Sequence, residues 1–391
     1  MDAVLEPVAQ AQLQGTLAPF GASAGLPGDA YRSPATFAWE LRHFFEGGWV
    51  CVGRADDLSQ PGDRRAVRVG TETAVLVRDT TGTLRAFFNV CRHRGHELLQ
   101  AGESGSGETV ECPYHGWEYA LDGRLRSAPR LGRRTSFQVG EHGLAPMRLA
   151  QWHGFAFVNV SGDAPDLQTY LGNVEAYVQP YAPESLISAA RTEYVVRANW
   201  KLIGENYHEC YHCPKIHPEL CRVTPPDSGE NSSPDGAWVG GSMDLMDHAQ
   251  TMSMTGESRG EMLPGLNAKQ RRQVYYIGLF PNLYVSMHPD YVLTHRVEPL
   301  TADSSRVECE WLFPPEALAR PGFDPTYATE FWDVTNKEDW AACESVQRGT
   351  SSRAYKPGPI SGPEDAVYQF VTMVADGYLN GRAQRPRVPP R

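Results

Sequence analysis

The sequence lacks any long run of apolar residues. Across its 391 residues, no stretch approaches the ~20 consecutive apolar side chains needed to cross a bilayer. Basic residues are also in deficit, because 36 Lys and Arg stand against 47 Asp and Glu and give a net charge of −11. Proteins that bind nucleic acid or anionic lipid in a general way need a basic surface. We therefore expect neither nucleic acid nor a membrane as a partner.

The N-terminus lacks the features of a targeting segment. Its first stretch, MDAVLEPVAQAQLQG, holds two acids and no basic residue, unlike a secretory signal or a transit peptide. The expected location is cytoplasmic, where the eight cysteines are expected to be free thiols or metal ligands rather than disulfides. No G-x-G-x-x-G followed by a suitable acid occurs, so we expect the chain to bind neither NAD nor flavin itself.

The pattern of apolar residues divides the chain into three parts. Residues 1–35 are rich in Ala, Gly and Pro and predict an irregular segment. Residues 36–162 begin with an amphipathic helix over 36–45 and continue as short alternating runs with turn signals, which predict a small all-β domain. Residues 163–391 mix strands and helices without regular alternation, which predicts an α+β domain on an antiparallel sheet.

Within the third part we expect particular elements. Helices are predicted over residues 166–181, 200–212 and 326–348, the last being the final large element. Strands are predicted within 194–200, 273–280, 283–289 and 306–313, and a loop over 224–241.

Two short motifs in the β-rich region each pair one cysteine with one histidine. Cys91 and His93 form C-x-H, and Cys112 and His115 form C-x-x-H. Two thiolates and two imidazoles are the ligand set of a Rieske [2Fe–2S] cluster, in which the histidines hold one iron and the cysteines the other. A structural zinc site is the alternative, although zinc fingers favour pairs of like residues. His96 breaks the pattern and is expected to be a polar loop residue.

A second group of histidines follows in the segment ANWKLIGENYHECYHCPKIHPEL. His208 and His212 complete H-E-x-x-H, the signature of helical zinc proteases. The third-ligand spacing H-x-x-G-x-x-H is absent, because His217 follows His212 by five residues with no glycine between them. A cluster domain also has no role in a protease. We therefore expect His208 to be a polar residue with its hydrogen bonds satisfied and not a metal ligand. The segment is expected to serve a chemistry other than proteolysis.

The cluster motifs NVCRHRGHELL and CPYHGWEYALDGRL closely resemble the Rieske domain of the Rieske non-haem iron oxygenases, the α subunits of ring-hydroxylating dioxygenases and related monooxygenases. The resemblance extends from about residue 36 through the catalytic domain. It implies an all-β Rieske domain followed by a catalytic domain with a helix-grip-like antiparallel sheet. In that domain two histidines and one carboxylate hold a mononuclear Fe(II) on one face, and the opposite face stays open for O₂ and substrate.

The resemblance also implies the ligands of this iron. The family's histidines fall on His212 and His217. Its distant carboxylate falls on Asp339, within FWDVTNKEDWAACESVQRG. Asp333 and Glu338 are rival acids on other faces of the same predicted helix, and the alternative for either is a solvated side chain.

The acid three residues before the first ligand is Glu209. In the family, this acid contacts an iron-ligating histidine and a cluster histidine of the neighbouring subunit, which implies a head-to-tail homotrimer. Cys210 and Cys213 form C-x-x-C, a redox or zinc motif elsewhere, but here they are expected to be buried packing residues.

An iron that binds O₂ needs two electrons from outside, and a Rieske cluster supplies them singly. The pairing implies an oxygenase served by a separate reductase or ferredoxin, ultimately from NAD(P)H. The run GRLRSAPRLGRR, residues 123–134, holds five arginines and no acid. It either docks an acidic electron donor or is a solvated loop. A non-catalytic Rieske electron carrier is the alternative that needs no second metal site.

The segments ANWKLIGENYHECYHC, HPEL and CESVQRGTSSRAY are most similar to the glycine betaine, choline and carnitine oxygenase branch. That branch implies monooxygenation of a small quaternary ammonium substrate, by hydroxylation or by N-demethylation with formaldehyde release. Such a substrate needs an aromatic cage. Candidate aromatics near the iron motif are Trp200, Tyr207, Tyr211, Tyr275, Tyr276, Phe280 and Tyr284. The competing hypothesis is hydroxylation of an aromatic ring.

Overall fold

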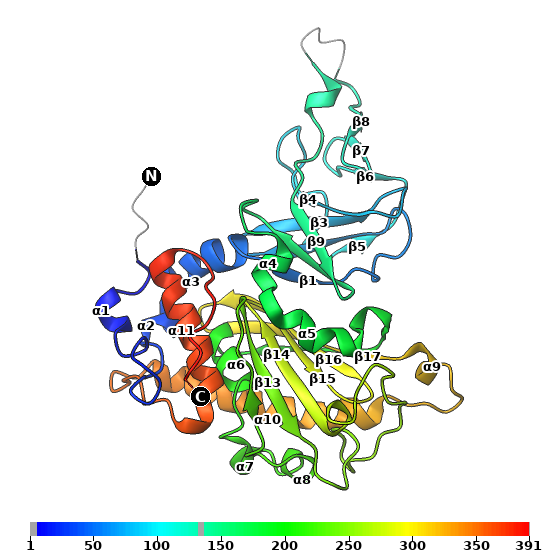
Figure 1. Ribbon diagram of the computed structural model, residues 1–391. Helices are drawn as coiled ribbons and strands as arrows, with labels where there is room; N and C mark the ends of the chain where they lie inside the picture. Colours follow the sequence, from blue (N-terminus) through cyan, green and yellow to red (C-terminus); the bar gives the residue numbers. More distant parts are fainter. Residues whose placement is uncertain (1–5, 132–136, 391) are drawn as a thin grey trace. The chain divides into compact units, whose positions relative to one another are not determined.

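The fold consists of two units that divide the chain unequally (Figure 1). The computed structural model describes residues 6–131 and 137–390. One unit comprises Phe45–Ala164, and the other joins the chain up to Phe44 to the chain from Pro165 onward. The boundary near residue 163 lies close to the predicted one. The predicted boundary at residue 36 differs, because the structure groups residues 36–44 with the catalytic domain instead of the cluster domain.

A buried acid explains this grouping. Residues 36–45 form the helix α3 (Pro34–Glu40) and a π-helical turn, η1 (Leu41–Glu46). Glu40 is fully buried; its Oε1 lies 2.6 Å from Lys201 Nζ, and its Oε2 accepts a hydrogen bond of 2.8 Å from the indole of Trp200. Both partners belong to α6 (Trp200–Tyr207) of the larger unit. Since a carboxylate stays in a core only with such partners, the helix must pack where they lie.

The smaller unit is built from antiparallel sheets, as predicted. It contains a three-stranded sheet of β1 (Val50–Arg54), β10 (Phe155–Asn159) and β9 (Arg148–Trp152). A four-stranded sheet follows the order β4 (Leu84–Phe88), β3 (Glu72–Arg78), β2 (Arg64–Val69) and β5 (Ser104–Gly105). A second three-stranded sheet holds β6 (Thr109–Glu111), β7 (Glu118–Ala120) and β8 (Leu125–Ser127). The core between them includes Cys91 and Cys112, packed with Val75, Trp117 and Tyr119.

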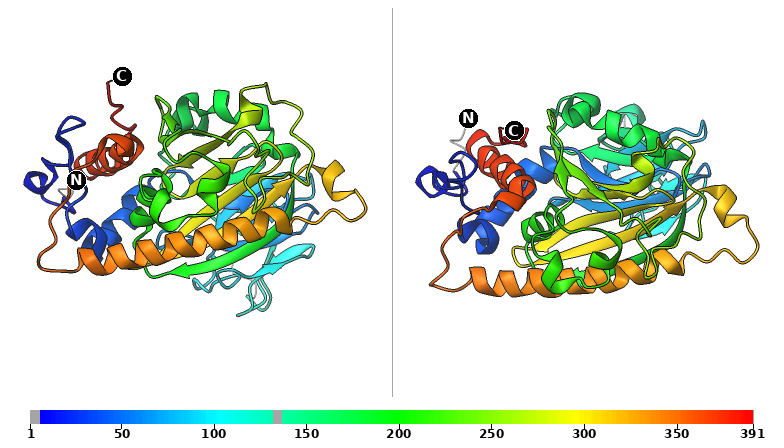
Figure 2. Two further views of the ribbon diagram at one scale, coloured as in Figure 1. Left: turned by 90° about the horizontal axis from the view of Figure 1, so that it is seen from below. Right: turned by 60° about the horizontal axis from the view of Figure 1, so that its bottom comes forward.

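The larger unit contains one antiparallel sheet of seven strands. Their order is β11 (Ile187–Val196), β17 (Ser304–Phe313), β16 (Val292–Thr301), β15 (Leu283–Met287), β14 (Gln273–Leu279), β13 (Trp238–Asp244) and β12 (Glu230–Asn231). The long helix α10 (Thr326–Thr350) lies along one face of this sheet (Figure 2). Its contacts with the sheet include a 3.0 Å hydrogen bond between Asn336 Oδ1 and His295 Nε2. The antiparallel α+β architecture is therefore confirmed.

The remaining helices are short, apart from one at the end of the chain. The short helices are α1 (Gln10–Leu13), α2 (Asp29–Arg32), α4 (Leu167–Leu171), α5 (Glu175–Val178), α7 (Cys213–Ile216), α8 (Leu220–Val223) and α9 (Pro315–Leu318). The last helix is α11 (Asp365–Asn380). None of the helices in the described residues is both long enough and apolar enough to cross a bilayer.

Several predictions of secondary structure were wrong. The predicted loop over 224–241 contains β12 and the start of β13. Gly240 and Gly241 hid that strand, because glycine weakens a strand pattern. They are needed because a Cβ at either position would collide with the backbone of a neighbouring strand. The strand β16 and the helix α11 were missed, and the predicted helix over 200–212 ends at Tyr207.

Candidate active site

The two cysteine–histidine motifs form two copies of the same tight loop. The backbone N–H of Cys91 donates to the carbonyl of His96 at 2.8 Å, and Gly95 N–H donates back to the carbonyl of Cys91 at 3.0 Å. The loop at Cys112 repeats both bonds with Trp117 and Gly116, at 2.8 and 3.0 Å. Each glycine has a positive φ, of 73° and 67° respectively, which favours glycine at that turn. The sequence motif therefore closes locally, without help from distant residues.

The donor set of these loops fits a Rieske cluster. The thiols of Cys91 and Cys112 are buried, whereas His93 and His115 lie toward the surface with ring centroids 4.6 Å apart. The Nδ1 atom of His93 is buried and has no hydrogen-bond partner among the described residues, as expected of an atom that coordinates metal. Tyr119 lies behind the loop, with its hydroxyl 3.2 Å from Cys91 Sγ. Burial raises the pKa of Cys112, so binding a metal there would require loss of the thiol proton.

The segment that carries His212 and His217 does not form one continuous helix. Positions five residues apart on an α-helix point about 140° from each other, so His212 and His217 could not meet on one. Instead α6 ends at Tyr207, and α7 starts at Cys213. The carboxylate of Glu209 shapes the turn between them, because it accepts hydrogen bonds from the backbone N–H groups of Tyr211 and His212.

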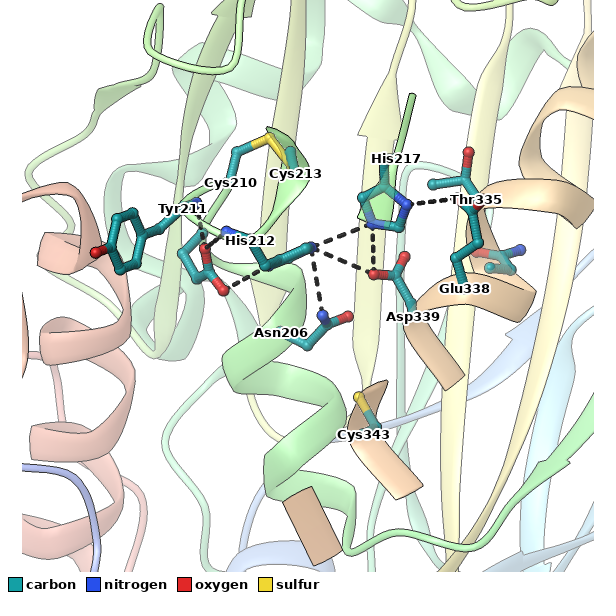
Figure 3. A network of polar contacts seen from close by, with 12 residues as sticks. Asn206, Cys210, Tyr211, His212, Cys213, His217, Thr335, Glu338, Asp339 and Cys343 are labelled. Carbon is teal, nitrogen blue, oxygen red and sulfur yellow. Dashed lines mark hydrogen bonds and ion pairs between the residues drawn. A yellow bond between two sulfur atoms is a disulfide. The ribbon is translucent and has the colours of Figure 1, made fainter. Parts of the chain in front are cut away.

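This turn brings three donor atoms from distant parts of the chain together (Figure 3). His212 Nε2 lies 3.2 Å from His217 Nε2 and 3.3 Å from Asp339 Oδ1, and His217 Nε2 lies 2.9 Å from the same carboxylate oxygen. Three ligands on one face of an octahedral metal, each about 2.1 Å from it, are about 3.0 Å apart. The three atoms therefore fit a two-histidine, one-carboxylate site.

The outer nitrogen of each histidine also faces a carboxylate. His212 Nδ1 donates to Glu209 Oε1 at 2.5 Å, and His217 Nδ1 donates to Glu338 Oε2 at 2.8 Å. Burial lowers the pKa of His212, but the contacts with Asp339 and Glu209 outweigh it and raise the pKa to about 9. Burial raises the pKa of Asp339, and the two histidines overcome this and hold it below its usual value. Positive charge is thus favoured between these side chains, which suits the binding of a metal cation.

The rival acids occupy other places. Asp333 accepts a 2.7 Å hydrogen bond from Tyr194 and pairs with Lys337 at 2.6 Å, so it faces away from the histidines. Glu338 reaches only the outer nitrogen of His217. Of the three candidates, Asp339 alone approaches both Nε2 atoms.

A cavity of about 490 Å³ opens beside the three donor atoms. Four of the seven predicted cage aromatics line it, namely Tyr207, Tyr211, Tyr276 and Tyr284. Trp200, Tyr275 and Phe280 do not line it. Trp332 and Trp340 of α10 also line the wall and were missed. The sequence did contain a signal for this wall of the cavity. Trp332 and Asn336 precede Asp339 by seven and three residues, so they lie on the same helix face as that predicted ligand.

Three further expectations concern residues outside the group of three donor atoms. Cys210 and Cys213 form a disulfide across the turn, so the prediction of unpaired packing residues was wrong; the break in the helix brings the two sulfurs together. His208 is buried at the cavity wall, outside the group of three donor atoms, and burial lowers its pKa to about 3. In the basic run, Arg124 and Arg126 are exposed, and its last three residues lie outside the described ones.

The chain matches two protein families over most of its length. The Rieske [2Fe-2S] domain family matches residues 48–142, and the family of the ring hydroxylating alpha subunit (catalytic domain) matches residues 183–379. The glycine betaine monooxygenase oxygenase subunit of Chromohalobacter salexigens is 32% identical, over 91% of this chain and 86% of that protein. The carnitine monooxygenase oxygenase subunit of Escherichia coli is 37% identical, over 49% of this chain and 52% of that protein.

A solved structure shows the same fold in a related enzyme. The quaternary ammonium Rieske monooxygenase CntA, in complex with L-carnitine, superposes with a TM-score of 0.78. It is 27% identical in sequence, and the match covers 96% of this chain and 99% of that one. The resemblance predicted from the motifs is confirmed: the chain belongs to the Rieske non-haem iron oxygenases, as an α subunit whose cofactors are a Rieske [2Fe–2S] cluster and a mononuclear iron that uses O₂.

Proposed function

We propose that this oxygenase hydroxylates or N-demethylates a small quaternary ammonium substrate of the betaine type. The observation that carries the proposal is the lining of the cavity. Aromatic rings come from α6, from the sheet and from α10, and the lining includes four carboxylates but no Lys or Arg among the described residues. Such a wall suits the ammonium group of the substrate.

The charge of the lining favours a cation even with metal bound. Its carboxylates are Glu209, Asp227, Asp339 and Asp365, so a divalent iron leaves an excess of negative charge. A quaternary ammonium group cannot donate hydrogen bonds and is held instead by aromatic faces, at about 0.5–2 kcal/mol each. A neutral aromatic substrate would gain nothing from these acids.

The aromatic walls are held in place by polar contacts. Tyr207 lies at their centre, with ring centroids 4.8 Å from Tyr284 and 5.9 Å from Tyr276. Its hydroxyl is 2.9 Å from Ser286 Oγ of β15. On the side of α10, Trp332 and Trp340 line the cavity together with His295. We infer that these rings orient the N-methyl groups toward the metal.

The geometry supports the proposed ligands. Cys91, His93, Cys112 and His115 hold the cluster in the smaller unit. In the larger unit, the mononuclear iron is held by the donors His212, His217 and Asp339, whose spacing fits a facial site. Bound there, Fe(II) supplies O₂ activation with electrons from the cluster. The residues of the cavity orient the substrate and exclude bulk water.

Electron delivery is proposed to cross between subunits of a homotrimer. Glu209 supports this, because one of its oxygens holds His212 while the adjacent Tyr211 is 62% exposed. The turn that carries Glu209 therefore lies near the surface, where a cluster histidine of a second copy would approach it, although the Glu209 side chain itself is 13% exposed. A separate reductase or ferredoxin would supply the electrons from NAD(P)H.

The decisive experiment compares a cation with its neutral-carbon isostere. Glycine betaine and 3,3-dimethylbutanoate differ in replacing N⁺ by carbon, so the comparison isolates the charge. We expect betaine to bind at least about tenfold more tightly by calorimetry, since two cation–π contacts of about 1 kcal/mol suffice. Turnover with a reductase and NADH should couple O₂ uptake to product, read as formaldehyde where demethylation occurs. Equal binding of the two compounds, or turnover of simple aromatics but not of quaternary amines, would contradict the proposal.

A further inference from the structure

The inner nitrogen of His217 faces Asp339, and its outer nitrogen faces a different acid, Glu338. We propose that Glu338 is a positioning residue that fixes the ring orientation and tautomer of His217 for metal binding. The inference rests on the proposed iron site. It assigns a role to an acid that the sequence offered only as a rival ligand or a solvated side chain.

The contact has the geometry of a charge-assisted hydrogen bond. Glu338 Oε2 lies 2.8 Å from His217 Nδ1, and the histidine side chain is 2% exposed (Figure 3). A carboxylate only accepts, so Nδ1 must carry the proton and donate it. In a neutral imidazole this leaves the lone pair on Nε2. That atom is the one that lies 2.9 Å from Asp339 Oδ1, in the donor triangle.

A single helix controls both nitrogens of this ring. Glu338 and Asp339 are neighbours on α10, yet their carboxylates reach opposite nitrogens of His217. The ring is thereby held at both ends by one rigid element. His212 is held differently, because its outer nitrogen contacts Glu209 within its own turn, three residues away.

The alternatives for Glu338 do not fit its surroundings. A solvated acid would be more exposed than the observed 30% and would not be aimed at a buried ring nitrogen. A direct ligand would have to reach the three-donor face, but Glu338 lies on the outer side of His217. Outer carboxylates of this kind raise ligand basicity, and their loss costs about 10–100-fold in metal affinity.

The test measures Fe(II) affinity of the iron-depleted catalytic site in the full-length protein with its cluster intact, by competition with a chelator. We expect E338A to weaken Fe(II) binding about 10–100-fold. E338Q should recover part of that loss, because its amide oxygen still accepts from Nδ1–H but without the charge. The matched control is E330A, an exposed acid on the same helix, which should bind as the wild type does. The cluster absorption spectrum and the melting temperature verify that each variant is folded.

The outcomes separate this inference from the iron site itself. If D339A retains wild-type iron content, the proposed site fails. If D339A loses the iron while E338A binds it as tightly as E330A does, only the positioning role is overturned. An affinity of E338Q no better than that of E338A would also overturn it, because a hydrogen-bond acceptor would then make no difference.

Discussion

Removing the ammonium group of Lys201 should destabilise the larger unit strongly. Lys201 Nζ and Glu40 Oε1 are 2.6 Å apart, and both side chains are 0% exposed. Burial lowers the pKa of Lys201, and the Glu40 carboxylate counteracts the shift. Lys201→Met leaves the carboxylate in the core with only neutral donors, from Trp200 and Tyr378. Breaking a buried pair from one side costs about 3–5 kcal/mol, and these remaining bonds place the expected loss near 3 kcal/mol.

The measurement is thermal unfolding followed by circular dichroism. At about 2–4 °C per kcal/mol for a domain of this size class, the melting temperature should fall by about 6–12 °C. Lys337→Met is the control, because Lys337 pairs with Asp333 at the same 2.6 Å but with side chains 65% and 38% exposed. Exposed pairs contribute about 0–1 kcal/mol.

A double variant tests the reasoning. In E40Q/K201M neither charge of this pair is left in the core, so the melting temperature should lie above that of K201M alone. If K201M melts no lower than K337M, or if the double variant is the least stable, burial of an unpaired charge does not govern this site.

Two further predictions follow from titratable groups of the larger unit. Burial raises the pKa of Glu205 from its usual 4.5 to about 7, so the stability that its protonated form contributes at pH 4.5 is lost as the pH rises through 7. The free energy of unfolding of Glu205→Gln should match that of the wild type at pH 4.5 and exceed it at pH 8 by up to about 3 kcal/mol. A difference that does not change with pH would contradict this. At pH 7 the metal-free site should hold a proton on His212, whose pKa is raised to about 9 by Asp339 and Glu209 against the opposing effect of burial. Fe(II) binding should therefore release about one proton or more, measured by calorimetry in buffers of different ionisation enthalpy; binding without proton release would refute the assignment.

The two loops of the proposed cluster site follow from local sequence. Cys91 and His93, like Cys112 and His115, lie within loops of a few residues that close through their own backbone bonds. Local spacing therefore specifies the two loops and the placement of the proposed ligands within them. His212 and His217 were also proposed as a pair from their local spacing. The sequence did not show that the predicted helix ends at Tyr207, which lets the two side chains meet.

Tertiary structure decided what depends on distant residues. Three acids on α10 were compatible with the sequence, and only the packing of that helix against the sheet brings Asp339 to both histidines. The same packing turns Glu338 from a rival ligand into a partner of His217. The grouping of α3 with the catalytic domain was likewise set by a contact between Glu40 and Lys201, far apart in the chain. Local patterns determine short loops because few dihedral angles are involved, whereas the choice among equivalent acids depends on how two rigid elements pack.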